Sequence, residues 1–162
     1  MKTTINIFLK PLIFLAFVFC FVTARAQEES NNIKSLIEAK QFVFKAQTAL
    51  PASMSTRQLS GDNYDLKLFG DSLVSYLPYF GRAYTAPVPG SPGGYNFTST
   101  KFDFTAKETK KGGWDIVIKP EDVTDFREFS LLVSKSGSAT LRALSNNRQM
   151  ISYNGYITEV KK

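Results

Sequence analysis

The chain alternates hydrophobic and polar residues over most of its length, beginning near Gln41. A period of two points successive side chains to opposite faces of a strand, so that one face enters a core while the other meets water. Such alternation is typical of antiparallel sheets. The apolar positions of the predicted strands are Phe42, Phe44 and Ala46; Tyr64, Leu66 and Leu68; Phe102, Phe104 and Ala106; Trp114, Ile116 and Ile118; Phe129, Leu131 and Val133; Ala139, Leu141 and Ala143; and Ile151 and Tyr153.

Short polar or glycine-containing pairs lie between these runs. Gly70-Asp71, Gly112-Gly113 and Ser136-Gly137 predict hairpin turns, because glycine supplies the positive φ that two-residue turns require, and Asn146-Asn147 fits a fourth turn less strictly. Gly155, inside the last run, indicates a bulge or a close backbone approach. We predict a mainly β fold of about eight or nine antiparallel strands that closes into an up-and-down barrel, since closure satisfies the edge strands. A two-sheet sandwich is the alternative.

The first 26 residues have the parts of a secretory signal. Basic residues as far as Lys10 precede an apolar run over residues 11–22, and Ala24 and Ala26 place small side chains at the −3 and −1 positions of a cleavage site. A run of 12 residues is too short to cross a hydrocarbon core of ~30 Å. We therefore expect cleavage after residue 26, with an uncleaved anchor as the alternative, and no stable membrane insertion afterwards.

A polar lead-in with one short helix follows over residues 27–40. Ile33, Leu36 and Ile37 fall at helical spacing and form one apolar stripe. Residues 41–162 then make up the predicted barrel domain.

Composition excludes most common catalytic chemistry. Histidine is absent, and Cys20, the only cysteine, lies in the predicted signal. The mature chain therefore has no disulfide, no Cys/His zinc site and no Ser-His or Cys-His pair. Glu121, Asp122, Asp125 and Glu128 form an acidic run, but it lacks the ligand spacing of a calcium loop and is interpreted as a solvated helical turn or loop. We predict no enzyme activity, no catalytic residue, no metal and no cofactor.

Removal of the signal lowers the formal net charge from +6 to +3, with 17 basic and 14 acidic residues left. The basic residues are scattered along the chain. A nucleic-acid groove needs a concentrated basic stripe, so no nucleic-acid partner is expected. The absence of cysteine after cleavage is compatible with a periplasm.

Several segments resemble the family of domain of unknown function 4251, exported bacterial proteins. They are residues 76–84 (YLPYFGRAY), 93–94 (GG) before an aromatic residue, 111–114 (KGGW), 136–141 (SGSATL) and 147–155 (NRQMISYNG). The resemblance implies a lipocalin-like antiparallel barrel with an N-terminal helix, in the periplasm of a Gram-negative bacterium. It implies no reaction.

One long irregular stretch, residues 78–94, carries the candidate site. Tyr79, Phe80 and Tyr84 surround Arg82, a combination suited to a ligand rim in which the arginine holds an anionic group. Arg148 and Tyr153 are weaker candidates for the same rim. The structural alternative is that the rings plug one end of the barrel, while Arg82 stacks on a tyrosine or caps exposed carbonyls.

Two functions follow from these patterns. The first is a periplasmic barrel that binds a small apolar or amphipathic ligand at one mouth, with residues 78–94 as a lid. The alternative is a cell-envelope scaffold or protein-interaction module with a solid core. A ligand binder needs a connected cavity of ~300 Å³ or more, whereas a scaffold needs a filled interior and an exposed surface for its partner.

Overall fold

The computed structural model describes residues 32–61, 63–84 and 93–160 of the chain. The predicted signal and residues 27–31 of the lead-in lie outside these residues. So does a large part of the predicted lid, residues 85–92.

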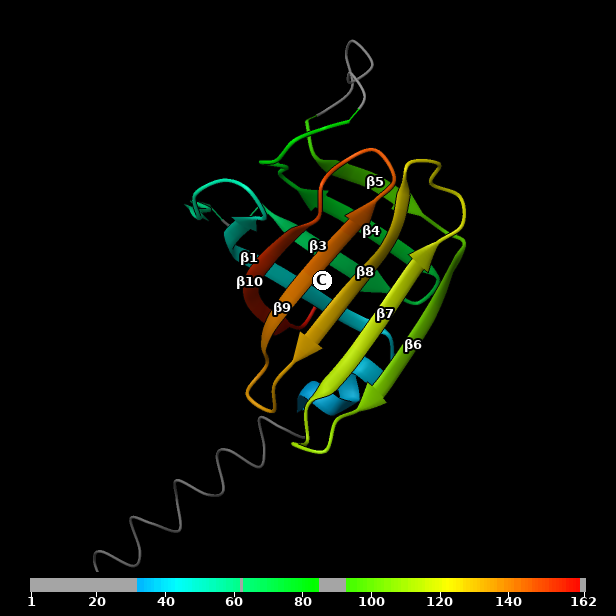
Figure 1. The fold of residues 1–162 in the computed structure, drawn as a ribbon. Helices are drawn as coiled ribbons and strands as arrows, with labels where there is room; N and C mark the ends of the chain where they lie inside the picture. The colour runs from blue at the N-terminus through cyan, green and yellow to red at the C-terminus, as the bar shows by residue number, and fades with distance from the viewer. Residues whose placement is uncertain (1–31, 62, 85–92, 161–162) are drawn as a thin grey trace, which may run out of the picture.

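Nine strands form one curled antiparallel sheet in the order β5-β4-β3-β1-β10-β9-β8-β7-β6, and β2 pairs beside β1 (Figure 1). The strands are β1 (Gln41–Pro51), β2 (Arg57–Gln58), β3 (Asp65–Phe69), β4 (Ser72–Leu77), β5 (Tyr95–Ser99), β6 (Phe102–Glu108), β7 (Trp114–Pro120), β8 (Phe126–Val133), β9 (Ser138–Ser145) and β10 (Ile151–Thr158). The sheet curls into a nearly closed barrel, which confirms the predicted up-and-down barrel. The alternative, a sandwich of two sheets, is not what the structure shows. Its break lies between β5 and β6, because β1 and β10, the first and last strands, pair with each other.

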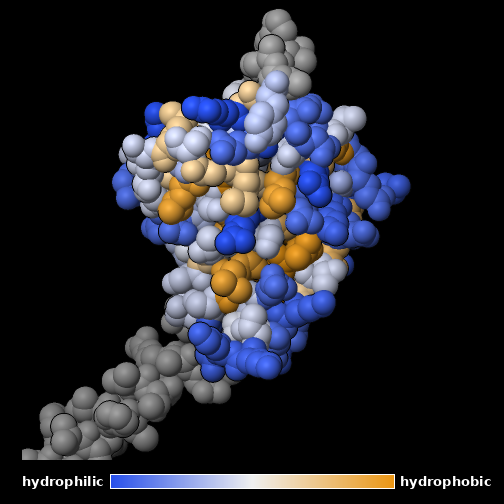
Figure 2. Space-filling view, in the orientation of Figure 1, coloured by the Kyte–Doolittle hydropathy of each residue, from blue (hydrophilic) through white to orange (hydrophobic). Residues whose placement is uncertain are grey.

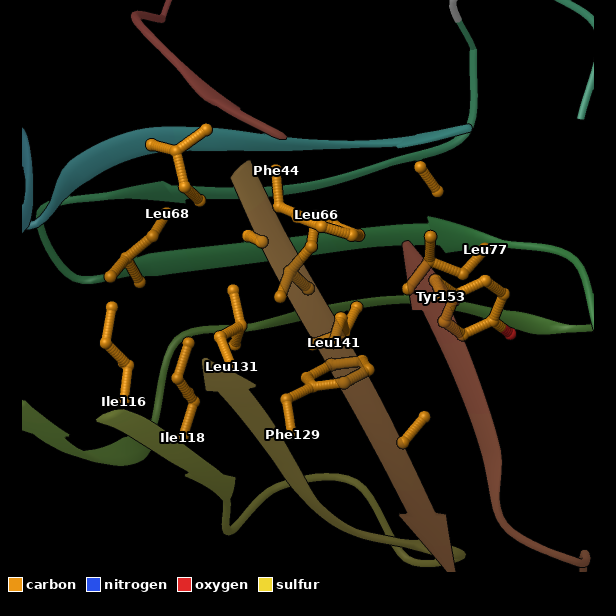
Figure 3. Packing of buried hydrophobic residues seen from close by; sticks show 14 of the residues in the cluster. Phe44, Leu66, Leu68, Leu77, Ile116, Ile118, Phe129, Leu131, Leu141 and Tyr153 are labelled. Atoms are coloured by element: carbon orange, nitrogen blue, oxygen red, sulfur yellow. The ribbon is translucent and has the colours of Figure 1, made fainter. Parts of the chain in front are cut away.

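The barrel interior is packed with the side chains that the alternation placed on one face. Phe44, Leu66, Ile118, Phe129 and Tyr153 come from different strands and meet in one cluster (Figure 3), each with 0% of its surface exposed. The predicted inward positions of β1, β3, β7, β8, β9 and β10 are therefore confirmed.

Strand β6 is the exception to this burial. Phe102 and Phe104 are only partly buried against the core, and Ala106 is exposed. β6 pairs with β7 alone, so its other edge has no neighbouring strand to cover the inward side chains. The alternation correctly predicted that these residues form a strand. It did not predict that their inward side chains would be incompletely buried at the break in the sheet.

The predicted short helix spans residues 32–38 and lies at one end of the barrel (Figure 1). Ile33 and Ile37 enter the core, with 5% and 1% of their surfaces exposed, and Leu36 packs beside them. The turn that follows the helix contains Lys40, whose φ of 52° reverses the chain and whose N–H donates to the carbonyl of Ile37 at 3.1 Å. Within the described residues, no helix has the length and apolar character needed to cross a membrane.

Three of the four predicted turns use glycine as expected. Gly70, Gly112 and Gly137 have φ values of 57°, 75° and 76° in the β3–β4, β6–β7 and β8–β9 turns. Asn146-Asn147 instead begins a longer connection between β9 and β10, in which the Asn147 amide donates to Asp125 Oδ1 at 2.7 Å.

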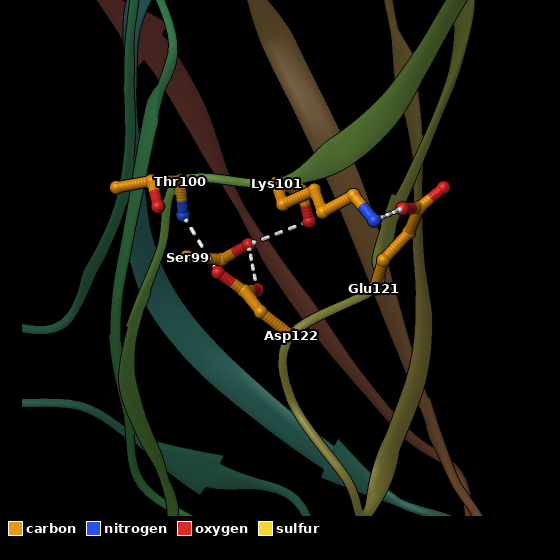
Figure 4. Close-up of polar contacts among 5 residues, drawn as sticks. All are labelled: Ser99, Thr100, Lys101, Glu121 and Asp122. Atoms are coloured by element: carbon orange, nitrogen blue, oxygen red, sulfur yellow. Dashed lines mark hydrogen bonds and ion pairs between the residues drawn. The ribbon is translucent and has the colours of Figure 1, made fainter.

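A polar cluster joins the β5–β6 corner to the chain that leaves β7 (Figure 4). Ser99 Oγ lies 2.5 Å from Asp122 Oδ1, and the Thr100 N–H donates to Asp122 Oδ2 at 3.0 Å. Lys101 pairs with Glu121 at 2.9 Å. β5 and β6 are the two edge strands of the sheet and do not pair with each other. These polar contacts therefore attach the corner between them to the β7–β8 loop.

Glu121, Asp122 and Asp125 of the acidic run lie in the loop between β7 and β8, whereas Glu128 lies within β8. The carboxylates of the run have separate partners. Glu128 pairs with Lys119 at 3.7 Å, and Asp125 accepts from Asn147. Among the described residues, no three side chains of the His, Cys, Asp and Glu types gather as metal ligands would.

Gly155 lies where β10 approaches β1 most closely, which confirms the predicted bulge or close approach. The register between β1 and β10 shifts between Ala46 and Thr48, beside the pair of Ala46 with Gly155. A Cβ at Gly155 would collide with the Lys45 carbonyl oxygen, which is backbone and cannot move independently.

We expect Gly155→Ala to lower the free energy of unfolding by about 2–3 kcal/mol, because the new methyl group would separate the two terminal strands. Gly93→Ala is the matched control. Gly93 has open space around its Cβ position and no positive φ, so its substitution should change stability by less than about 0.5 kcal/mol. Urea unfolding measures the stability of both variants. Equal effects of the two substitutions would contradict the inference that Gly155 is required by the close approach of β10 to β1.

The hydrogen bonds of Asp122 also predict that the stability of the protein depends on pH. The Ser99 hydroxyl and then the Thr100 N–H lower the pKa of the Asp122 carboxyl, so its stabilisation is complete above the unfolded-state pKa of about 3.9 and is lost as pH falls through the lower folded value. Asp122→Asn should therefore destabilise the protein near neutral pH, and its difference from wild type should shrink below about pH 4. Asp103→Asn, on the exposed face of β6, serves as the control, and a pH-independent Asp122→Asn effect would contradict this role.

Candidate functional site

The predicted rim residues lie at the end of the barrel opposite the helix, where the chain leaving β4 meets the β9–β10 connection. Backbone hydrogen bonds join the two segments: the Tyr84 N–H donates to the Asn147 carbonyl at 2.8 Å, and the Gln149 N–H donates to that of Arg82 at 3.0 Å. An isolated bridge pairs Ala83 with Arg148 between these bonds. Two segments more than sixty residues apart thus form a short ladder across this end of the barrel.

Arg148 is the central cation of this end. Its guanidinium lies 5.3 Å from the Tyr79 ring centroid and 5.4 Å from that of Tyr95, and its Nη1 donates to the Gly94 carbonyl at 2.7 Å. It therefore stacks on tyrosines and caps a carbonyl, which is what the structural alternative expected of Arg82. The Arg82 side chain is exposed, and its backbone carbonyl forms the contacts instead.

Tyrosine hydroxyls also satisfy backbone carbonyls here. Tyr153 is fully buried, and its hydroxyl donates to the Pro78 carbonyl at 2.7 Å. The Tyr79 hydroxyl lies 2.8 Å from the Arg82 carbonyl oxygen and 2.9 Å from that of Gln149. Burial raises the pKa of both phenols, so both hydroxyls are neutral hydrogen-bond donors at ordinary pH.

Tyr95 completes the cluster and was not among the predicted site residues. Its ring meets Tyr79 edge-on at 5.6 Å and Phe126 at 5.2 Å, which makes the end of the barrel continuous with the core. Its buried hydroxyl has no hydrogen-bond partner among the described residues, and burial raises its pKa. The sequence feature that could have pointed to Tyr95 is its position directly after Gly93-Gly94, one of the segments that resemble the family.

The six predicted residues therefore divide into two groups. Tyr79, Arg148 and Tyr153 come together and close the end of the barrel. Phe80 packs beneath Arg57, whose guanidinium lies 4.8 Å from its ring, while Arg82 and Tyr84 are exposed, the latter by 70%. Ligand binding by these residues stays a prediction, because the neighbouring residues 85–92 lie outside the described part of the chain.

Comparisons with known proteins address the family and the fold. A family described as a domain of unknown function, DUF4251, matches residues 24–157. The chain is also similar to the crystal structure of a DUF4251 family protein from Bacteroides eggerthii DSM 20697, with a TM-score of 0.60 and 15% sequence identity over 81% of this chain and 87% of that chain. No curated protein matches the chain. At this identity the structural likeness supports the fold alone.

Two Tyr-to-Phe substitutions distinguish the hydroxyls of this cluster. Tyr153→Phe leaves the Pro78 carbonyl without its donor and should lower the free energy of unfolding by about 1–2 kcal/mol. Tyr95→Phe removes a hydroxyl that has no partner among the described residues, so stability should be unchanged or rise by up to about 1 kcal/mol. Urea unfolding with a constant m-value measures both. A loss in Tyr95→Phe as large as that in Tyr153→Phe would show that the Tyr95 hydroxyl has a partner of its own.

Proposed function

Because this chain belongs to the DUF4251 family, whose function is unknown, we propose a function from its geometry. The protein is an exported, non-enzymatic module of the cell envelope that has a solid barrel core and binds a partner protein through its outer surface. The observation that carries this proposal is the filled interior.

The interior favours a scaffold over a carrier of small molecules. Phe42, Phe44, Phe129 and Tyr153 are among the largest fully buried side chains, and they occupy the space that a ligand would need. A carrier requires a connected cavity of ~300 Å³ or more. The sealed end supports the same conclusion, because Arg148 and Tyr153 already bind the carbonyls of Gly94 and Pro78.

The outer surface offers a face suited to a protein partner. Phe69, Tyr76 and Tyr156 are 55%, 49% and 39% exposed and point outward from β3, β4 and β10; we call these three residues the aromatic face. Tyr76 and Tyr156 lie in one cross-strand row, joined through Lys45 and Asp65. Tyrosine is enriched in protein interfaces because a large rigid ring with a polar tip is ordered at little entropic cost.

Export and periplasmic location rest on the predicted signal in residues 1–26 and on a mature chain without cysteine. The non-enzymatic assignment rests on the lack of the common nucleophile–base pairs and on the neutral, carbonyl-bound tyrosines. Ligand binding at the predicted mouth is the second candidate. It is supported by the side chains of Arg82 and Tyr84, which are exposed at this end of the barrel.

Site-specific photo-crosslinking in the producing cell tests the interaction module. A photoreactive phenylalanine analogue at Tyr76 or Tyr156 should give the same discrete protein adduct. The analogue at Asp71, an exposed position of the β3–β4 turn, should give none and serves as the control. The proposal fails if neither aromatic position yields an adduct while native mass spectrometry of the protein purified from its own periplasm shows a retained uncharged small molecule.

A further inference from the structure

A groove of about 470 Å³ lies on the outer surface of β8, β9 and β10, away from the sealed end of the barrel. Its floor includes Leu132, Thr140 and Asn154, which are neighbours in one cross-strand row. By alternation these side chains point outward, opposite the buried Leu131, Leu141 and Tyr153. The β6–β7 turn and the β8–β9 turn form two of its walls.

The floor of the groove is apolar at Leu132, which is 60% exposed on the outer sheet face near the end of β8. Figure 2 shows hydrophobic surface on the face that carries β8, bordered by hydrophilic atoms. The Thr140 hydroxyl donates to the Asn154 amide oxygen at 3.1 Å, so these two polar side chains partly satisfy each other. This part of the groove therefore suits an apolar chain or ring.

The two turns supply positive charge at the other side of the groove. Lys111 and Lys135 both line it and are exposed, and neither forms an ion pair with another described residue. None of the lining residues is acidic. The hydroxyl groups of Thr109, Ser134 and Ser138 lie in the same lining and add hydrogen-bonding capacity.

Gly112 explains how two cationic turns come together. A Cβ at this position would collide with the aliphatic stem of Lys135, and its φ of 75° is in any case one that favours glycine. Lys135 therefore crosses directly over the turn that carries Lys111. Asp115 pairs with Leu132 in the register and is exposed on the same outer face, beside the apolar floor, although it does not line the groove.

We propose that this groove binds a small anionic amphipath, with its carboxylate or similar head group between Lys111 and Lys135 and its apolar part over Leu132. The volume falls within the range of small-molecule sites, and an anion between two ammonium groups gains charge-assisted hydrogen bonds. We expect the occupant to be a soluble molecule with one apolar chain. The surface of an anionic lipid bilayer is the alternative, because it offers the same combination of head group and apolar chain. The groove shares no residue with the aromatic face, although Asn154 of the groove and Tyr156 of that face both lie on β10, and the site adds a ligand to the proposed interaction module.

Fluorescence titration of the mature chain with 11-(dansylamino)undecanoate at low salt tests the proposal. Lys111→Gln/Lys135→Gln should weaken binding by about tenfold or more, and Leu132→Asn by about fivefold. Lys110→Gln changes an exposed lysine of the same turn that does not line the groove, so its affinity should stay within about twofold of wild type. All substituted positions are exposed, and an unchanged Tm shows that the variants fold.

Three results would overturn the site. These are equal affinity for the uncharged methyl ester of the probe, an equal loss in Lys110→Gln, and binding to phosphatidylglycerol vesicles without binding of the monomeric probe. A protein adduct at Tyr76 that persists in the double lysine variant would separate a failure of this groove from a failure of the interaction module.

Discussion

The pairing of β1 with β10 is the contact on which the architecture depends. It joins the two ends of the strand sequence in the middle of the sheet, so the barrel's break falls between β5 and β6. The approach is so close that the Lys45 carbonyl occupies the space of a side chain at position 155, which only glycine leaves free. Once these strands are paired, every hairpin on either side can add in sequence order, and the alternating residues of all of them face one interior.

That interior determines where the protein can act. Aromatic and aliphatic side chains fill it, and Tyr79, Tyr95, Arg148 and Tyr153 extend the packing to the end opposite the helix. Two backbone carbonyls of this end, those of Pro78 and Gly94, each accept a hydrogen bond from a side chain, Tyr153 and Arg148 respectively. The two surfaces proposed to bind partners therefore both lie on the outside of the barrel: the aromatic face on β3, β4 and β10, and the lysine-rimmed groove over β8, β9 and β10.

The incomplete seam shows how the fold manages an unpaired edge. β6 has a single neighbour, and its inward rings are only partly covered, with the Lys40 ammonium 5.2 Å from the Phe104 centroid. At the corner, Asp122 receives hydrogen bonds from the end of β5. Charged residues on β6, such as Lys107 and Glu108, also disfavour the addition of another strand.

The sequence by itself determined most of the strands, three glycine turns, the helix stripe and the inward face of the well-covered strands, because each depends on local periodicity or on φ preferences of single residues. It also indicated the close approach at Gly155. It did not identify which arginine closes the barrel end: Arg82 and Arg148 both lie in loop-like segments, and only the bridge between Ala83 and Arg148 turns the second one onto Tyr79 and Tyr95. The groove was equally invisible, since Lys111, Leu132 and Asn154 become neighbours only through strand register and through the bending of two turns. Local sequence fixes which side of a strand a residue faces, whereas the distance between residues on separate hairpins is set by how the whole sheet curls.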